Sequence, residues 1–201
     1  MKQSGIKPHL FSKHFGVSPS VLAAAGVFDP TLNIDTKLFP DPILLDASDH
    51  SEMREARTTF DNYFEQVRRL LLHSNGQKDH AAWKAAFQRL SFPEIQGTCL
   101  GYGSGSISGS GSGPKMTGRL AATGLQVAQM GIDDPDLFMA VGLFEEDFGP
   151  DMIGDMFTNV CFGEIAKFNS RIYNAINVPT EHFDITLKNG LRYEGHFAIN
   201  P

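Results

Sequence analysis

The chain has 201 residues, of which 41% are hydrophobic and 20% charged, and its formal net charge at pH 7 is -6. This length and composition are typical of one large globular domain or two small ones. No apolar run approaches the ~20 residues of a membrane-spanning helix, and the N-terminal segment lacks the apolar core of a signal peptide. We therefore expect a cytoplasmic protein without a membrane segment, in which Cys99 and Cys161 are reduced thiols.

The acidic excess lies entirely in the second half of the chain. Residues 1–100 contain 11 basic and 11 acidic side chains, whereas residues 101–201 contain 6 basic and 12 acidic ones. An acidic surface repels the phosphate backbone of DNA or RNA. Direct nucleic-acid binding is therefore disfavoured, and a protein partner is expected instead.

The first half of the chain, residues 1–92, is predicted to be mainly helical. It opens with a polar arm and a short helix that begins at the capping Ser18 and stops at Gly26. Prolines in residues 38–45 favour an extended segment there. The strongest helix runs from Ser51 to about Ser74, because apolar side chains recur at three- and four-residue spacing.

The helix over residues 51–74 is followed by a second one. Its predicted range is Asp79 to Leu90, with Trp83 and Phe87 one turn apart, so that the two helices form a hairpin. A short strand is predicted over residues 95–102. Residues 101–114 contain six glycines and five serines, and this composition predicts a flexible surface loop. A phosphate-binding loop is the less favoured alternative, because Pro114 stands where the Walker pattern needs lysine.

The second half, residues 115–201, is predicted to combine acidic helices with a C-terminal hairpin. Helices are expected from Pro114 to Gly131, over residues 133–142, and as one long element from Pro150 to about Ile176. Apolar residues then alternate on both sides of Asn189-Gly190, a pattern typical of a β-hairpin. The fold class is therefore α+β, mainly helical, in a single domain over residues 1–201. The end directly after a strand leads us to expect an N-terminal fragment of a longer protein.

Five carboxylates fall between residues 145 and 155, in the most acidic stretch of the chain. Asp151 and Asp155 are one helical turn apart, and with Glu146 they are the candidate ligands for a hard cation such as Mg²⁺ or Mn²⁺. Two other interpretations stay open: a polar interaction face, or a solvated helix start favoured by the helix dipole. In each of these, Asn159 is expected on the same face as the two aspartates.

Several segments, in order along nearly the whole chain, resemble the N-terminal region of a family of large bacterial proteins. They are Gly26–Leu32, Asp35–Leu45, Cys99–Tyr102, and Gly142–Glu146 through Asp155-Met156. In this family a PD-(D/E)xK nuclease domain lies far downstream, which implies a restriction-type or antiphage defence factor. The family pattern G-[I]-G-x-D-x-I-S-D-M is matched at Asp151, Ile153, Asp155 and Met156. Met152 and Gly154 replace a usual arginine and serine.

Three functional hypotheses follow from the residues and the resemblance. The first is a non-catalytic N-terminal regulatory or assembly module of a defence-type nuclease, because Asp184 is followed by no E-x-K and Glu194-Gly195-His196 lacks the lysine. The second is a stand-alone divalent-metal-dependent nuclease or hydrolase that uses the acidic stretch. The third is an acidic protein-interaction module. No HxH, HExxH or GxSxG pattern adds a further catalytic candidate.

Overall fold

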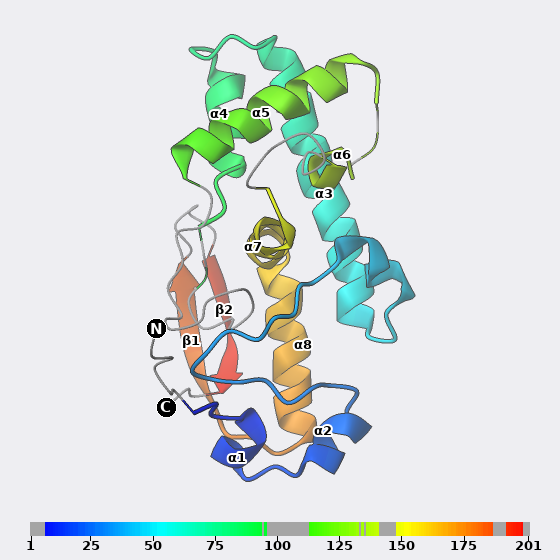
Figure 1. Cartoon of the computed structure of the whole chain (residues 1–201), viewed down its shortest axis with the longest axis vertical. Helices are drawn as coiled ribbons and strands as arrows, with labels where there is room; N and C mark the ends of the chain where they lie inside the picture. The colour runs from blue at the N-terminus through cyan, green and yellow to red at the C-terminus, as the bar shows by residue number, and fades with distance from the viewer. Residues whose placement is uncertain are drawn as a thin grey trace, which may run out of the picture.

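The computed structural model shows a mainly helical α+β fold with one antiparallel C-terminal hairpin, which confirms the predicted fold class (Figure 1). It describes residues 7–93, 95, 113–132, 134, 136–140, 148–186 and 192–198. The elements are α1 (Phe11–Phe15), α2 (Pro19–Ala24), the 3₁₀ helix η1 (Pro42–Ala47), α3 (Ser51–Ser74), α4 (Ala81–Arg89), α5 (Pro114–Gln129), α6 (Leu137–Ala140), α7 (Pro150–Val160), α8 (Phe162–Ala175), β1 (Thr180–Thr186) and β2 (Arg192–Ala198).

Helix α3 is the element against which most of the others pack. It contacts η1, α4, α5, α7 and α8, and it runs along one side of an elongated molecule (Figure 1). Its predicted bounds are confirmed, and it ends at Asn75, whose left-handed φ of 47° is followed by Gly76 at 74°. The residues of its apolar stripe that are fully buried are Ala56, Phe60, Phe64, Val67 and Leu71.

The main core fills the space between α3 and the helices α4 to α7. Phe64 lies at its centre, with ring centroids 6.1 Å from Phe92 and 5.0 Å from Phe138. Gly124 lets α5 approach this cluster, because a Cβ added there would stand 2.7 Å from the Phe138 ring. The close contact between α5 and α6 therefore depends on a residue without a side chain.

The prediction of one long helix over residues 150–176 is wrong, because this segment forms two helices, α7 and α8, which are separated at Cys161. Cys161 leaves the helical conformation with φ -103° and ψ 21°. Side chains in the last turns of α7 bond to the preceding backbone: Thr158 Oγ1 to Gly154 O at 2.8 Å, and Asn159 Nδ2 to Asp155 O at 2.9 Å. Such bonds compete with helix geometry and often bend helices. The two helices run in clearly different directions (Figure 1).

Two smaller apolar clusters lie on α8. At its C-terminal end, Ile172 and Ile176 pack with Phe11 and Leu22 from the N-terminal helices α1 and α2. Near its N-terminal end, Phe162 and Ala166 are the buried residues against which the hairpin packs. Helix α8 therefore joins α1 and α2 to the C-terminal hairpin in the lower part of the molecule (Figure 1).

Partly buried ion pairs connect α3 to distant parts of the chain. Glu52, which is 8% exposed, accepts two hydrogen bonds from the Arg171 guanidinium of α8. Arg57 lies between two carboxylates, with Nε 3.0 Å from Asp61 and Nη2 2.9 Å from Asp136, just before α6. These charged groups hold the lower and middle parts of α3 to α8 and α6.

Other predicted elements shift by small amounts or change type. The prediction of an extended segment over residues 38–45 is wrong in part, since the 3₁₀ helix η1 begins at Pro42. The Asp41 carboxylate caps η1 by accepting a hydrogen bond from the backbone amide of Ile43. Helix α4 begins at Ala81, after His80 as its N-cap, and α6 is the described part of the helix predicted over 133–142. Nearly all of the predicted strand over 95–102 and of the glycine-rich loop over 101–114 lies outside the described residues. Across the described ranges, no helix combines the length and hydropathy needed to span a membrane.

Candidate metal centre

The acidic site predicted on α7 forms only in part. Asp151 and Asp155 line one small pocket together with residues 38–40, Gly154 and Thr158. The pocket has a volume of about 20 Å³, which is room for about one water molecule. Burial raises the pKa of Asp151 above its ordinary value, and the nearby Asp35 carboxylate adds to the rise. Glu146, the third predicted ligand, lies outside the described residues.

Asn159 does not share the exposed face predicted for it. The residue is 1% exposed, and its Nδ2 donates to Pro93 O at 2.7 Å as well as to Asp155 O. Its Oδ1 is buried without a hydrogen-bond partner among the described residues. The amide therefore fixes the segment after α4 to the end of α7, and the interpretation in which Asn159 shares a solvated face with the two aspartates is wrong.

A second group of potential metal ligands lies on the C-terminal hairpin. Strands β1 and β2 are antiparallel, and their register places His182 opposite His196 and Asp184 opposite Glu194. Directly opposed residues in an antiparallel pair share one face of the sheet, as do residues two apart on one strand. All four side chains therefore project from the same face, and all four are exposed.

The other face of the hairpin is attached to α8. Ile185, Tyr193 and Phe197 pack on the Phe162 and Ala166 cluster. Strand β2 lies in van der Waals contact with the helix at Gly195, where an added Cβ would stand 3.9 Å from Ala166. Ser170 Oγ also donates to the backbone oxygen of His196 at 3.0 Å. These contacts fix β2 on the helix and turn the polar face of the hairpin outward.

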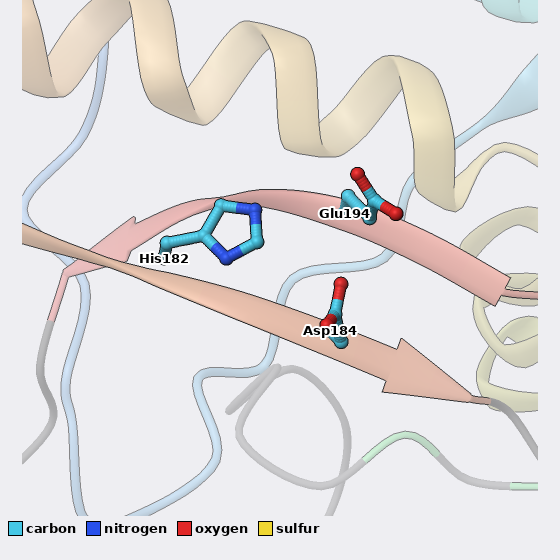
Figure 2. Close-up of side chains that lie close together, drawn as sticks. All are labelled: His182, Asp184 and Glu194. Carbon is cyan, nitrogen blue, oxygen red and sulfur yellow. The ribbon is translucent and has the colours of Figure 1, made fainter.

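Three of the four polar side chains bring their ligand atoms together. One nitrogen of His182 and one carboxylate oxygen each from Asp184 and Glu194 all lie within 4.8 Å of one another. Figure 2 shows the three side chains over the same stretch of the two strands. Among the described residues, this is the group of three or more His, Cys, Asp or Glu side chains that could hold an ion.

The opposed carboxylates of this face favour a bound cation, and Arg192, two residues from Glu194, is the basic side chain of β2 on the same face. Asp184 and Glu194 are directly opposed, and like charges in that position destabilise an antiparallel pair. Within the described part of the chain, neither carboxylate forms an ion pair with a basic side chain. A divalent ion between them would replace this repulsion by attraction to both carboxylates.

The ligand types define which chemistry is possible. Imidazole nitrogen binds divalent transition metals at about 2.0–2.1 Å and carboxylate oxygen at about 2.0–2.2 Å. Atoms that share a tetrahedral ion at these lengths stand about 3.4 Å apart. The present separations of up to 4.8 Å must therefore shorten by side-chain rotation, which the exposed face permits.

The hairpin group was missed by a search for ligand motifs within one continuous segment. Its members come from two pairs with a spacing of two, His182-x-Asp184 and Glu194-x-His196, on either side of the predicted turn. The signal that could have found it was already present, because apolar alternation in both strands places these four residues at the polar positions. The register of the two strands then brings the two pairs together.

The fold and this site define a mainly helical α+β domain with a candidate divalent-metal face on its C-terminal hairpin. A family model described as "Domain of unknown function (DUF8370)" matches residues 16–197, and the chain belongs to this family. Comparison with curated proteins and with solved structures gave no match.

Proposed function

We propose that this domain binds a divalent metal ion on the exposed face of its C-terminal hairpin. The observation that carries the proposal is the convergence of the ligand atoms of His182, Asp184 and Glu194 within 4.8 Å. Histidine and carboxylate ligands from two neighbouring strands are a suitable set for such an ion. The opposed carboxylates add a reason for the ion to bind, since it removes their mutual repulsion.

The position of the face favours binding over catalysis. Catalytic sites are usually concave and exclude water, which strengthens the electrostatic interactions within them. His182, Asp184 and Glu194 instead project from an exposed sheet face. We therefore assign the ion a structural or sensing role.

The metal-binding experiment is a calorimetric titration of the full chain with Zn²⁺ and, separately, with Mn²⁺. We expect one ion per chain in the wild type and loss of that binding in the double variant His182→Ala/Asp184→Asn. Glu181→Gln is the matched control, because Glu181 is an exposed acid on the same strand but on the opposite face. The proposal is overturned if no ion binds, or if the double variant binds as the wild type does.

A parallel variant separates the hairpin from the acidic pocket on α7. Asp151→Asn/Asp155→Asn removes both carboxylates that line the pocket and leaves the hairpin ligands unchanged. We expect the double variant to retain the ion. Loss of binding in this variant, with binding retained in His182→Ala/Asp184→Asn, would move the metal site to α7.

A second candidate function is a non-catalytic regulatory or assembly module of a bacterial defence-type nuclease. The resemblance to proteins with a downstream nuclease domain supports it, and so does a surface suited to a protein partner. Ile43 and Leu44 of η1 are 58% and 64% exposed, and the acidic Asp41 and Asp46 flank them in sequence. Exposed apolar side chains with a charged rim are typical of protein interfaces, and the acidic rim fits a basic partner.

The module hypothesis is tested by a nuclease assay on the isolated chain with plasmid DNA and Mg²⁺ or Mn²⁺. We expect no cleavage. Cleavage that disappears in Asp151→Ala would overturn this hypothesis and support the alternative of a metal-dependent nuclease that uses the acidic stretch.

A further inference from the structure

Resting on the proposed function, we infer that the hairpin ion is a transition metal of the zinc class and that His196 is its fourth ligand. The ion would then take two ligands from each strand: His182 and Asp184 from β1, Glu194 and His196 from β2. Four-coordinate binding of this kind joins the outer strand of the hairpin to the strand that is fixed on α8.

His196 is placed to complete the ligand set. It lies directly opposite His182, and the two imidazole centroids are 5.5 Å apart at an interplanar angle of 74°. It also lies two residues from Glu194, on the same exposed face. Its backbone is held by the bond from Ser170, while the residue is exposed to solvent.

The four positions form a rectangle on the sheet. Opposed Cβ atoms in an antiparallel pair stand about 4.5–5.5 Å apart, and residues two apart on one strand are separated by about 6.8 Å. An ion above the centre of this rectangle has all four side chains within reach. The longer Glu194 and the two imidazoles compensate for the shorter Asp184, because they can rotate toward it across the face.

The ligand set selects the class of ion. Mg²⁺ and Ca²⁺ prefer six or more oxygen ligands, whereas imidazole nitrogen suits Zn²⁺ and its transition-metal neighbours. Two imidazoles and two carboxylates give Zn²⁺ the four-coordinate N and O environment in which it is commonly found. The two carboxylate charges also neutralise the ion, so the complex has no excess charge.

The order of the strands gives this site a mechanical consequence. Strand β2 lies between β1 and α8 (Figure 1). It packs on the helix through Tyr193, Gly195 and Phe197. Strand β1 is held mainly by its ladder to β2. A two-stranded ribbon is marginal by itself, so an ion that bridges both strands would stabilise β1 in particular.

The test is a titration of the wild-type chain and of His196→Gln with Co²⁺, a spectroscopic substitute for Zn²⁺, followed by visible absorption. We expect the wild type to give the intense visible bands of four-coordinate Co²⁺ and to release the ion to Zn²⁺ but not to an equal concentration of Mg²⁺. In His196→Gln we expect at least a tenfold loss of affinity and weaker bands. Glu181→Gln should behave as the wild type does.

The outcomes separate this inference from the proposed function. If His196→Gln binds Co²⁺ with unchanged affinity and spectrum, His196 is not a ligand, although the metal site itself stands. If Mg²⁺ displaces Co²⁺ as readily as Zn²⁺ does, the assignment to the zinc class is wrong. If neither Co²⁺ nor Zn²⁺ binds the wild type, the proposed function fails as well. Hydrogen exchange should slow on Zn²⁺ addition in the amides of β1 more than in those of α3, and equal protection would refute the bridging role.

Discussion

Replacement of Arg57 by methionine tests how the domain tolerates a charged group inside its structure. The Arg57 side chain is only 14% exposed, and it lies between the Asp61 and Asp136 carboxylates, which are 32% and 29% exposed. Its Nη1 also donates to Pro42 O at 3.4 Å. Methionine keeps much of the length of the side chain but leaves two neighbouring carboxylates without their common cation.

The magnitude follows from the degree of burial. Removing one partner of a fully buried pair costs about 3–5 kcal/mol, whereas an exposed pair contributes about 0–1 kcal/mol. Because the two carboxylates are about one-third exposed, we expect Arg57→Met to lower the free energy of unfolding by about 2 kcal/mol. Arg69→Met is the matched control on the same helix, since that side chain is 74% exposed and its loss should cost below about 0.5 kcal/mol.

Urea unfolding followed by far-UV circular dichroism, near neutral pH and again near pH 4, measures both variants. Burial raises the pKa of Asp61; Arg57 opposes this rise, and the nearby Asp136 adds to it. Without Arg57, the pKa of Asp61 in the folded state rises further above its value in the unfolded state, so Asp61 binds a proton more readily in the folded state. The destabilisation should therefore shrink as the pH falls toward 4. The reasoning is refuted if Arg57→Met costs no more than Arg69→Met, or if acidification enlarges the difference.

Three further predictions concern the core and its edges. Gly124→Ala should lower the free energy of unfolding by about 1–3 kcal/mol in thermal or urea unfolding, because its Cβ would meet the Phe138 ring at 2.7 Å. This loss should occur although alanine is the better helix former. An unchanged stability would show that the ring moves away freely. Hydrogen bonds from Arg171 lower the pKa of Glu52 to about 2, so the stability that Glu52 contributes is present above about pH 4.5 and is lost toward pH 2. Glu52→Gln should therefore make the free energy of unfolding less dependent on pH between these values. A pH profile equal to that of the wild type would contradict this. Burial raises the pKa of the Cys161 thiol, and its Sγ donates to a backbone oxygen at 3.3 Å. In a Cys99→Ser background, a thiol reagent should therefore label Cys161 only when the protein unfolds. Rapid labelling of the native chain would refute the burial of this thiol.

Local patterns were sufficient for α3 and insufficient for the break between α7 and α8. Helix α3 has a continuous apolar stripe and a left-handed end at Asn75 and Gly76, both of which can be read from neighbouring residues. The apolar stripe also continues across Cys161, so the local pattern predicts one unbroken helix. The break accompanies distant contacts: Cys161 Sγ bonds to Ala56 O, and Asn159 bonds to Pro93 O.

The hairpin shows how far a strand pattern can be taken. Apolar alternation predicts the hairpin and separates its apolar from its polar face, but the register determines which polar residues are opposed. The pairing of Thr186 with Arg192 leaves the five residues 187–191 between them, and this odd number keeps Phe183 and Phe197 on the same face. A one-residue slip would place His182 opposite Phe197 and separate the ligand atoms. The acidic stretch on α7, in contrast, was conspicuous because its carboxylates are close in sequence.

The packing of α1 and α2 on the end of α8 sets an order of events during synthesis. Leu22 is 2% exposed, and the side chains that cover it include Ile172 and Ile176, about 150 residues later. At about 5–20 residues per second, roughly 8–30 s pass before the ribosome has made that partner. The apolar residues of α1 and α2 remain exposed to solvent for this time, whereas α3 can pack with α4 as soon as both helices have emerged from the ribosome. Helices α1 and α2 are therefore expected to complete their packing after α3 and α4, although they are made before them, and to need protection by a chaperone in the interval.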